Sequence, residues 1–237
     1  MWSISAVKER AKTVLYGNYW SVFLVCLLVS ITGGGSSGNN SRYTFRDGEF
    51  SLYNPVTRRV IFIVIGMMVL RLIIGYIIEA GSRRYLLNLC KGQNDIGLIG
   101  FGFSEGRYGN IFKTMFFKGV LVFLWSLLLI IPGIVMGYAY RFVPYLLAEN
   151  PRMKWSRALE LSKNMTEGHK WQMFVFDLSF IGWYLLGALA FGLGVLFVHP
   201  YHETALTEIY NELKLTAVTD GLTSYDELTE NREFILD

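Results

Sequence analysis

The sequence has 237 residues, of which 52% are apolar and only 17% are charged, and its formal net charge is +3. Few soluble domains of this length have so apolar a composition. The small net charge, with basic residues scattered along the chain, argues against a nucleic-acid partner.

Apolar residues gather in five long runs, which indicate a membrane protein. The runs are Tyr19–Ile31, Val60–Ile78, Phe116–Ile131, Ile134–Ala148 and Trp171–Val198. A helix rises about 1.5 Å per residue, so roughly 20 residues cross a hydrocarbon core of roughly 30 Å. Because the bilayer offers the backbone no hydrogen-bond partners, we predict an all-α, polytopic transmembrane fold.

The residues before the first run predict an amphipathic helix at the membrane surface. Ile4, Val7 and Ala11 recur at helical spacing, opposite Lys8 and Lys12. Basic residues before an apolar stretch are also typical of a secretory signal, but a signal peptide begins its apolar region sooner. We therefore expect an interfacial helix that leads into the first span.

Lysine and arginine are unevenly shared among the loops, and this predicts the orientation of the chain. The N-terminal segment, Gly81–Lys118 and Asn150–Lys170 are rich in basic residues, whereas Thr32–Arg59 carries four arginines partly offset by two acidic residues. Basic loops stay preferentially on the cytoplasmic side. We expect the N-terminus and the two basic loops inside the cell and Thr32–Arg59 outside.

Proline and glycine interrupt two of the runs. The pair Pro132-Gly133 predicts a tight outer turn between the third and fourth spans. As one helix Trp171–Val198 would be about 42 Å long, so we favour a break near Gly192–Gly194 over a single span. With the chain returning through Val195–Leu213, the prediction is about six membrane segments. The hinge candidates are Pro132, Gly133, Gly192 and Gly194.

The second basic loop and the C-terminal tail each have a distinct sequence pattern. An apolar face with Ala158 and Met165 lies opposite Arg157, which predicts a cytoplasmic amphipathic helix with Asn150 as its N-cap and Pro151 as its first residue. It could anchor neighbouring spans or form a gate or docking surface for a cytoplasmic partner.

The chain divides into one membrane domain, residues 1–213, and an acidic tail, residues 214–237, which we expect to be mobile and cytoplasmic.

Four stretches resemble one family in order along nearly the whole chain. They are Val7–Trp20, Leu127–Pro151, Ala158–Trp171 and Ser179–Tyr201, the second of which reads LLLIIPGIVMGYAYRFVPYLLAENP. The chain resembles the bacterial integral-membrane family catalogued as domain of unknown function 975. The resemblance implies a bacterial cytoplasmic membrane as the location, and it implies no reaction, substrate or catalytic residue. More distantly, the hairpin is similar to membrane domains attached to some glycerophosphodiester phosphodiesterases, which hints at lipid-related biology.

Charged residues inside the apolar runs are the leading site candidates, because they are costly in lipid and usually face a partner or a cavity. Arg71, Arg141 and Asp177 fall within the second, fourth and fifth runs. Asp177 could pair with either arginine, leaving the other for an anionic substrate or lipid headgroup. The alternative is a structural ion pair plus an arginine that extends to the interface.

The sequence shows weak signs of a metal site and none of a cofactor. His199, His202 and Glu203 offer two imidazoles and a carboxylate, but their order differs from the HExxH motif of zinc proteases, so aromatic and imidazole packing is the favoured role. Gly100 and Gly102 lack the context of a phosphate-binding loop. We predict no cofactor, and an enzyme ranks third among the functions considered.

Two functions from different classes remain. The first is transport, or the handling of a lipid or peptide, along a polar path lined by Arg71, Arg141 and Asp177, which broken helices favour. The second is a non-catalytic adaptor or regulatory subunit that binds a protein partner through basic loops and acidic tail. The lack of any energy-coupling motif favours the second. Besides the lipid bilayer, the expected partner is a membrane or cytoplasmic protein.

Overall fold

The computed structural model describes residues 3–32, 55–104, 106–189 and 193–229, and all elements in that part of the chain are helices. This confirms the all-α prediction. The elements are α1 Ile4–Leu15, α2 Tyr19–Thr32, α3 Pro55–Cys90, the 3-10 helix η1 Ile96–Phe103, α4 Tyr108–Leu128, α5 Ile130–Ala139, α6 Val143–Glu149, α7 Trp155–Met165, α8 Lys170–Leu189, α9 Leu193–Thr219 and α10 Tyr225–Leu228.

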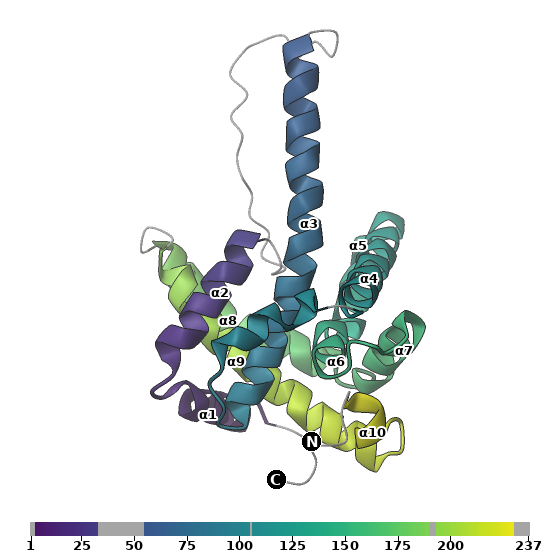
Figure 1. The fold of residues 1–237 in the computed structure, drawn as a ribbon. Helices are drawn as coiled ribbons and strands as arrows, with labels where there is room; N and C mark the ends of the chain where they lie inside the picture. Colours follow the sequence, from purple (N-terminus) through teal and green to yellow (C-terminus); the bar gives the residue numbers. More distant parts are fainter. Residues whose placement is uncertain (1–2, 33–54, 105, 190–192, 230–237) are drawn as a thin grey trace.

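The long helices reach toward one side of the molecule and the short ones cluster at the other (Figure 1). Helix α3 stands in the centre, with α2, α8 and α9 on one flank and the α4–α5 hairpin on the other. Helices α1 and α10 lie at the opposite end, with α6 and α7 between them and the hairpin. Helices α4 and α5, separated only by Leu129, pack side by side as a hairpin, as so short a connection between helices requires.

Three described stretches are long and apolar enough to cross a membrane: Tyr108–Leu128, Ile130–Glu149 and Lys170–Leu189. The second of these joins α5 and α6 across the break between them. Helices α1 and α2, bent by 100° at their junction, would make a fourth. Among the described residues this test thus finds three or four of the six predicted segments. Helix α2 has only 14 residues, about 21 Å, and α9 has a polar middle.

The core lies where the short helices meet the inner ends of the long ones. Its largest fully buried side chains include Tyr85 of α3, Phe142 and Tyr145 around α6, and Tyr210 of α9. The far ends are different, because the five apolar residues 127–131 at the tip of the α4–α5 hairpin are 63% to 76% exposed. Apolar surface so continuous marks a contact with another apolar phase or molecule.

The turn between α4 and α5 lies at Leu129, so the predicted turn at Pro132-Gly133 is displaced. Pro132 is the third residue of α5, where a backbone N–H would have no helical partner in any case. Gly133 lets the hairpin close, since a Cβ atom there would lie 2.6 Å from the Cα of Ser126. The pair therefore shapes the first turn of α5 instead of reversing the chain.

The run Trp171–Val198 belongs to two helices, as the sequence favoured. Helix α8 ends at Leu189 and α9 begins at Leu193, while Gly192 lies outside the described residues. The two helices pack side by side, and a Cβ atom on Gly187 would lie 2.6 Å from the carbonyl carbon of Gly194. Gly194 thus lies within α9 and permits close approach to α8.

Helix α9 crosses the boundary predicted at residue 213 and ends at Thr219. Beyond it, α10 packs against the bundle. Leu228 is 1% exposed, and the Asn150 side chain donates a hydrogen bond to the Glu227 carbonyl at 2.8 Å. Any mobile tail must therefore begin after Leu228, and residues 230–237 lie outside the described part of the chain.

The two amphipathic helices bury their apolar faces against the protein. Val7 and Ala11 of α1 are fully buried, mostly against α9. Ala158 and Leu161 of α7 are fully buried as well. Helix α7 begins at Trp155, later than predicted, because Asn150 forms a turn in which its side chain accepts a hydrogen bond from the Arg152 backbone.

Candidate functional site

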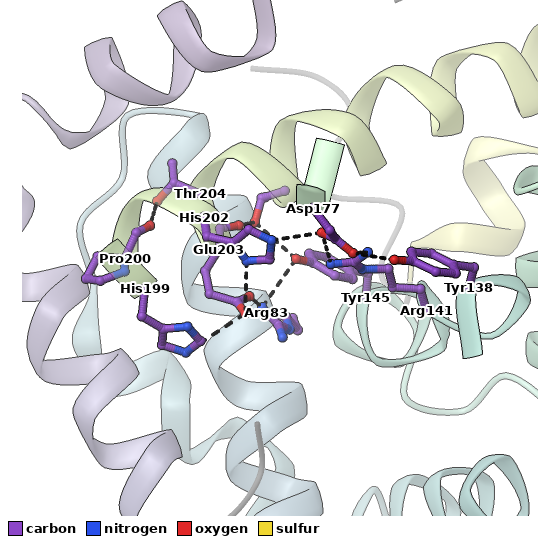
Figure 2. Close-up of polar contacts among 11 residues, drawn as sticks. Arg83, Tyr138, Arg141, Tyr145, Asp177, His199, Pro200, His202, Glu203 and Thr204 are labelled. Atoms are coloured by element: carbon purple, nitrogen blue, oxygen red, sulfur yellow. Dashed lines mark hydrogen bonds and ion pairs between the residues drawn. The ribbon is translucent and has the colours of Figure 1, made fainter. Parts of the chain in front are cut away.

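Asp177 is the centre of a charged network that joins helices distant in sequence. Both of its oxygens accept hydrogen bonds from Arg141, at 2.6 and 2.9 Å, and Tyr138 donates a third at 2.8 Å (Figure 2). A planar guanidinium matches a carboxylate in this two-point geometry. Of the two pairings left open by the sequence, the structure contains the Arg141–Asp177 pair.

Arg141 reaches Asp177 because the chain is not helical between α5 and α6. Its neighbours Tyr140 and Phe142 are buried there, so the open backbone is enclosed by protein. The carbonyl of Ala139, freed by the break, accepts hydrogen bonds from Ser162 at 2.8 Å and Thr166 at 3.4 Å. Helix α7 thus completes the hydrogen bonding of the break that positions Arg141.

His202 of α9 extends the network from the other side of Asp177. Its Nε2 lies 3.0 Å from an Asp177 oxygen, and its ring packs against Phe176 and Phe180 at centroid distances of 5.4 and 5.0 Å. The aromatic contacts fix the plane of the imidazole. Its second nitrogen, Nδ1, lies 4.0 Å from Glu203.

A second ion pair joins Glu203 to Arg83 of α3 (Figure 2). Both side chains are about nine-tenths buried, with exposed fractions of 11% and 10%. Arg83 also donates a hydrogen bond to the Tyr145 hydroxyl at 3.3 Å, and Nε2 of His199 lies 3.9 Å from Glu203. We call Arg83, Tyr138, Arg141, Tyr145, Asp177, His199, His202 and Glu203 the polar network.

A small cavity opens beside this second pair. It is lined by Val25, Cys26, Ser82, Arg83, Leu86, His199 and Glu203, and has room for about one water molecule. The Nε atom of Arg83 is buried and has no hydrogen-bond partner among the described residues. The lining includes Arg83, His199 and Glu203, so the cavity suits a polar occupant as small as water.

A further buried pair lies between α3 and α4, where Lys118 is 3.9 Å from Glu79. Glu79 and Arg83 are one helical turn apart, so α3 presents a carboxylate and a guanidinium toward different neighbours. Three buried charge pairs thus connect helices of the bundle, and the arginines and carboxylates of the polar network balance one another. A balanced set of this kind tolerates burial far better than single charges.

The sequence-predicted candidates fall into three groups. Arg141 and Asp177 meet, whereas Arg71 lies in α3 with its side chain outside the described part of the structure. His199, His202 and Glu203 converge on the two ion pairs. Among the described residues, no group of three or more His, Cys, Asp or Glu side chains is arranged to hold a metal ion.

Sequence reasoning missed Arg83, Tyr138, Glu79 and Lys118. Arg83 was assigned to a basic loop because the apolar run ends at Ile78, but α3 continues to Cys90. A signal was available: Tyr85, Leu86 and Leu89 continue a buried helical face beyond the run. Tyr138 could be found only from the tertiary contact with Asp177.

A family model described as "Protein of unknown function (DUF975)" matches residues 113–217. The chain carries a DUF975 region. The match runs from α4 into the last turns of α9, so it contains most of the polar network and confirms the predicted family resemblance. Arg83 and the N-terminal stretch Val7–Trp20 lie before the matched residues. No curated protein and no solved structure matches the chain. The DUF975 region and the apolar helices fit a membrane protein of unknown activity.

Proposed function

We propose that the chain is a multi-pass protein of the bacterial cytoplasmic membrane that transports, or otherwise handles, a small polar solute, lipid or peptide by way of the polar network. The observation that carries the proposal is the enclosure of two ion pairs, Arg141–Asp177 and Arg83–Glu203, among helices with apolar outer surfaces. Ionisable groups in such a setting are expensive and usually mark substrate or ion pathways.

The proposal includes a topology. Six membrane segments would be α2, α3, α4, α5, α8 and the first half of α9, with both termini in the cytoplasm. The break between α5 and α6 supports it, since broken helices in membranes are tolerated next to cavities or protein. We assign no chemical reaction to the protein.

The conformation described fits a closed state. The cavity beside Arg83 holds about one water molecule, too little for a lipid or peptide. Passage of cargo would require α8 and α9 to separate from α3 or α5, which means exchanging the ion pairs for contacts with cargo or water. Two balanced pairs at the joint between these helices are suited to that exchange.

Native mass spectrometry of protein extracted with its surrounding lipid tests the proposal. Wild type should retain a small molecule, peptide or selected lipid that Asp177→Ala loses. Arg10→Ala is the matched control, because Arg10 forms ion pairs with Glu208 and Glu212 but is 45% exposed and lies outside the polar network. Cargo retained equally by all three proteins, or by none of them, would contradict a binding role for the network.

The adaptor function remains a second candidate, supported by exposed basic side chains at one end of the molecule. Lys12, Lys91, Lys154 and Lys163 are exposed on α1, α7 and the loops. Because α10 is docked, a deletion that tests the tail should begin after Thr229, so that packed residues stay in place. A protein partner lost on removal of residues 230–237, and unaffected by Asp177→Ala, would favour the adaptor.

A further inference from the structure

We propose that the cargo of the polar network carries a phosphate group, and that this group takes the place of the Glu203 carboxylate at Arg83. The inference rests on the proposed function and names the class of cargo that it would handle. It starts from the way charge is divided in the bundle. Three largely buried cations lie on α3, α4 and the break after α5, whereas the carboxylates of the polar network lie on α8 and α9.

The cationic side consists of Arg83, Lys118 and Arg141. Lys118 is repelled electrostatically by both arginines, so the three cations share one region of the interior. Glu79 belongs to the same side and lies 3.9 Å from Lys118. Three cations against this one carboxylate leave an excess of positive charge unless α8 and α9 supply their acids.

The acidic side is one packed unit. Asp177 of α8 and Glu203 of α9 lie on two helices that pack side by side through a contact between glycines. Movement of these helices away from α3 and α5 would therefore withdraw both carboxylates together. Outside the polar network the pattern reverses, since Glu149 at the end of α6 binds Lys214 of α9 at 2.6 Å. Within the network, arginines left unpaired in the interior are costly, so the cargo that this side favours is an anion.

The surroundings of Arg83 suit the oxygens of a phosphate (Figure 2). A guanidinium binds phosphate in the same two-point geometry as carboxylate. The Tyr145 hydroxyl accepts a hydrogen bond from Arg83 at 3.3 Å and directs its own proton to Thr207 of α9 at 3.4 Å, because the Thr207 hydroxyl already donates to the Glu203 carbonyl. When α9 moves away, that phenol proton becomes free. A tetrahedral phosphate spreads its oxygens over more directions than a planar carboxylate, and so can bind the guanidinium and the phenol together.

Glu203, and not Asp177, is the carboxylate whose neutralisation should free the site. Arg83 lies in the continuous helix α3 and keeps its hydrogen bond with Tyr145 when the charge of Glu203 is removed. Arg141 lies in the non-helical break, and its two hydrogen bonds to Asp177 hold it in place. Loss of Asp177 thus disorganises the cationic side, whereas Glu203→Gln keeps an amide oxygen beside Arg83 and removes the competing charge.

Binding of defined compounds to the purified full chain in a neutral detergent tests the proposal. Dioctanoyl-phosphatidylglycerol is titrated by native mass spectrometry, and inorganic phosphate by calorimetry. Glu203→Gln should bind one or both about ten times more tightly than wild type, because a like charge no longer faces the anion. A gain for phosphatidylglycerol alone assigns the site to a lipid headgroup, and a gain for inorganic phosphate assigns it to phosphate-bearing solutes. Dioctanoylglycerol, which lacks the phosphate, should show no gain.

Glu212→Gln is the matched control. Glu212 also lies on α9 and pairs with an arginine, Arg10, at 2.6 Å, but it is outside the polar network, so the same change of charge should leave the affinity unchanged. Arg83→Gln should abolish binding. If Arg83→Gln does not fold, the double variant Arg83→Gln/Glu203→Gln removes both charges of the pair and leaves no buried charge without its partner. The double variant should fold and should not bind.

Equal affinities of wild type and Glu203→Gln for both phosphate compounds would overturn the inference. Binding that survives in the double variant would overturn it too, as would an equal gain in Glu212→Gln or for dioctanoylglycerol. A cargo without phosphate, retained by wild type in the native mass spectrum and lost in Asp177→Ala, would refute this inference while leaving the proposed function in place.

Discussion

The contact between α8 and the break after α5 depends on the Arg141–Asp177 ion pair. Two hydrogen bonds at 2.6 and 2.9 Å tie the break after α5 to the first half of α8, and the exposed fractions of the two side chains are 18% and 29%. Only a guanidinium satisfies both carboxylate oxygens from one residue. The identity of residue 141 is therefore as important as its charge.

Substituting Arg141→Lys should destabilise the protein by about 1.5–3 kcal/mol, because an ammonium keeps the charge but loses the two-point contact, and hydrogen bonds to charged groups contribute about that much. Denaturant unfolding in detergent measures the change. Arg10→Lys, at an exposed ion pair, should alter stability by no more than about 0.5 kcal/mol. Equal effects at the two positions would show that the inner pair contributes no more than a surface one.

Among the helices, the α8–α9 pair depends on two residues without side chains. Gly187 and Gly194 approach so closely that a Cβ atom on either would meet the backbone of the other helix. Small residues at such contacts let helix backbones approach, as in many membrane helix pairs. The contact also fixes the register that brings His202 opposite Asp177.

Gly187→Ala should therefore destabilise the hairpin by about 1–3 kcal/mol, the usual cost of overpacking. Gly182→Ala on the same helix is the matched control, since a Cβ there meets nothing within 4 Å. Alanine is the better helix former, so the control should gain up to about 1 kcal/mol. Thermal unfolding of both variants checks the prediction. A Gly187→Ala protein as stable as the control would disprove the tight contact.

Helix α10 is held to the bundle by a pH-sensitive ion pair. Arg157 donates hydrogen bonds to both oxygens of Glu227, at 2.7 and 3.0 Å, and these bonds lower the pKa of Glu227 below its ordinary value. The stabilisation is complete above the ordinary glutamate pKa of about 4.3 and is lost as the pH falls through the lower folded value. Docking should thus be strong at neutral pH and weaken in acid.

Hydrogen exchange at the Leu228 amide, which donates to the Ser224 carbonyl, measures that docking. At neutral pH, Glu227→Gln should expose this amide to faster exchange, whereas Asp226→Asn, at the exposed neighbouring position, should have little effect. As the pH is lowered below about 4, after correction for intrinsic exchange, protection should fall in wild type and change less in Glu227→Gln. Identical pH profiles would rule out Glu227 as the titrating group.

The sequence predicted the helices well where composition alone decides them. Apolar runs located most of α2, α4 and α8, and the cost of intramembrane charge singled out Arg141 and Asp177. The contact of His202 with Asp177 could not be predicted, because it depends on the register set by Gly187 and Gly194. The packed α10 was missed for a similar reason, since the partner of its acidic residue lies far away at Arg157.

At the scale of the whole molecule, exposed aromatic residues lie at the starts of three helices. Trp20, Tyr108 and Trp171, at or near the starts of α2, α4 and α8, are 67%, 36% and 74% exposed. Tryptophan and tyrosine favour the membrane–water boundary. In the proposed topology these helix starts lie at the cytoplasmic interface, and Asp177 lies about 9 Å beyond Trp171 along α8.

Labelling from defined sides tests that orientation. In a background with Cys26→Ser and Cys90→Ser, a cysteine at Ser37 should react with an impermeant maleimide in intact spheroplasts, because residues 32–59 are predicted outside. A cysteine at Lys154, which is exposed before α7, should react only after lysis. The reverse pattern would invert the topology, and reaction at both positions in intact cells would contradict it.

Hydroxyl groups in α7 and at its C-terminal end donate hydrogen bonds to the Ala139 carbonyl, and so connect the surface of the molecule to its interior. Ser162 and Thr166 bond the last residue of α5, two positions before Arg141. A binding event that lifted α7 would strip that carbonyl of both partners and loosen the backbone that aims Arg141 at Asp177. A contact made to the amphipathic helix α7 at the surface would thus reach the Arg141–Asp177 pair inside the bundle.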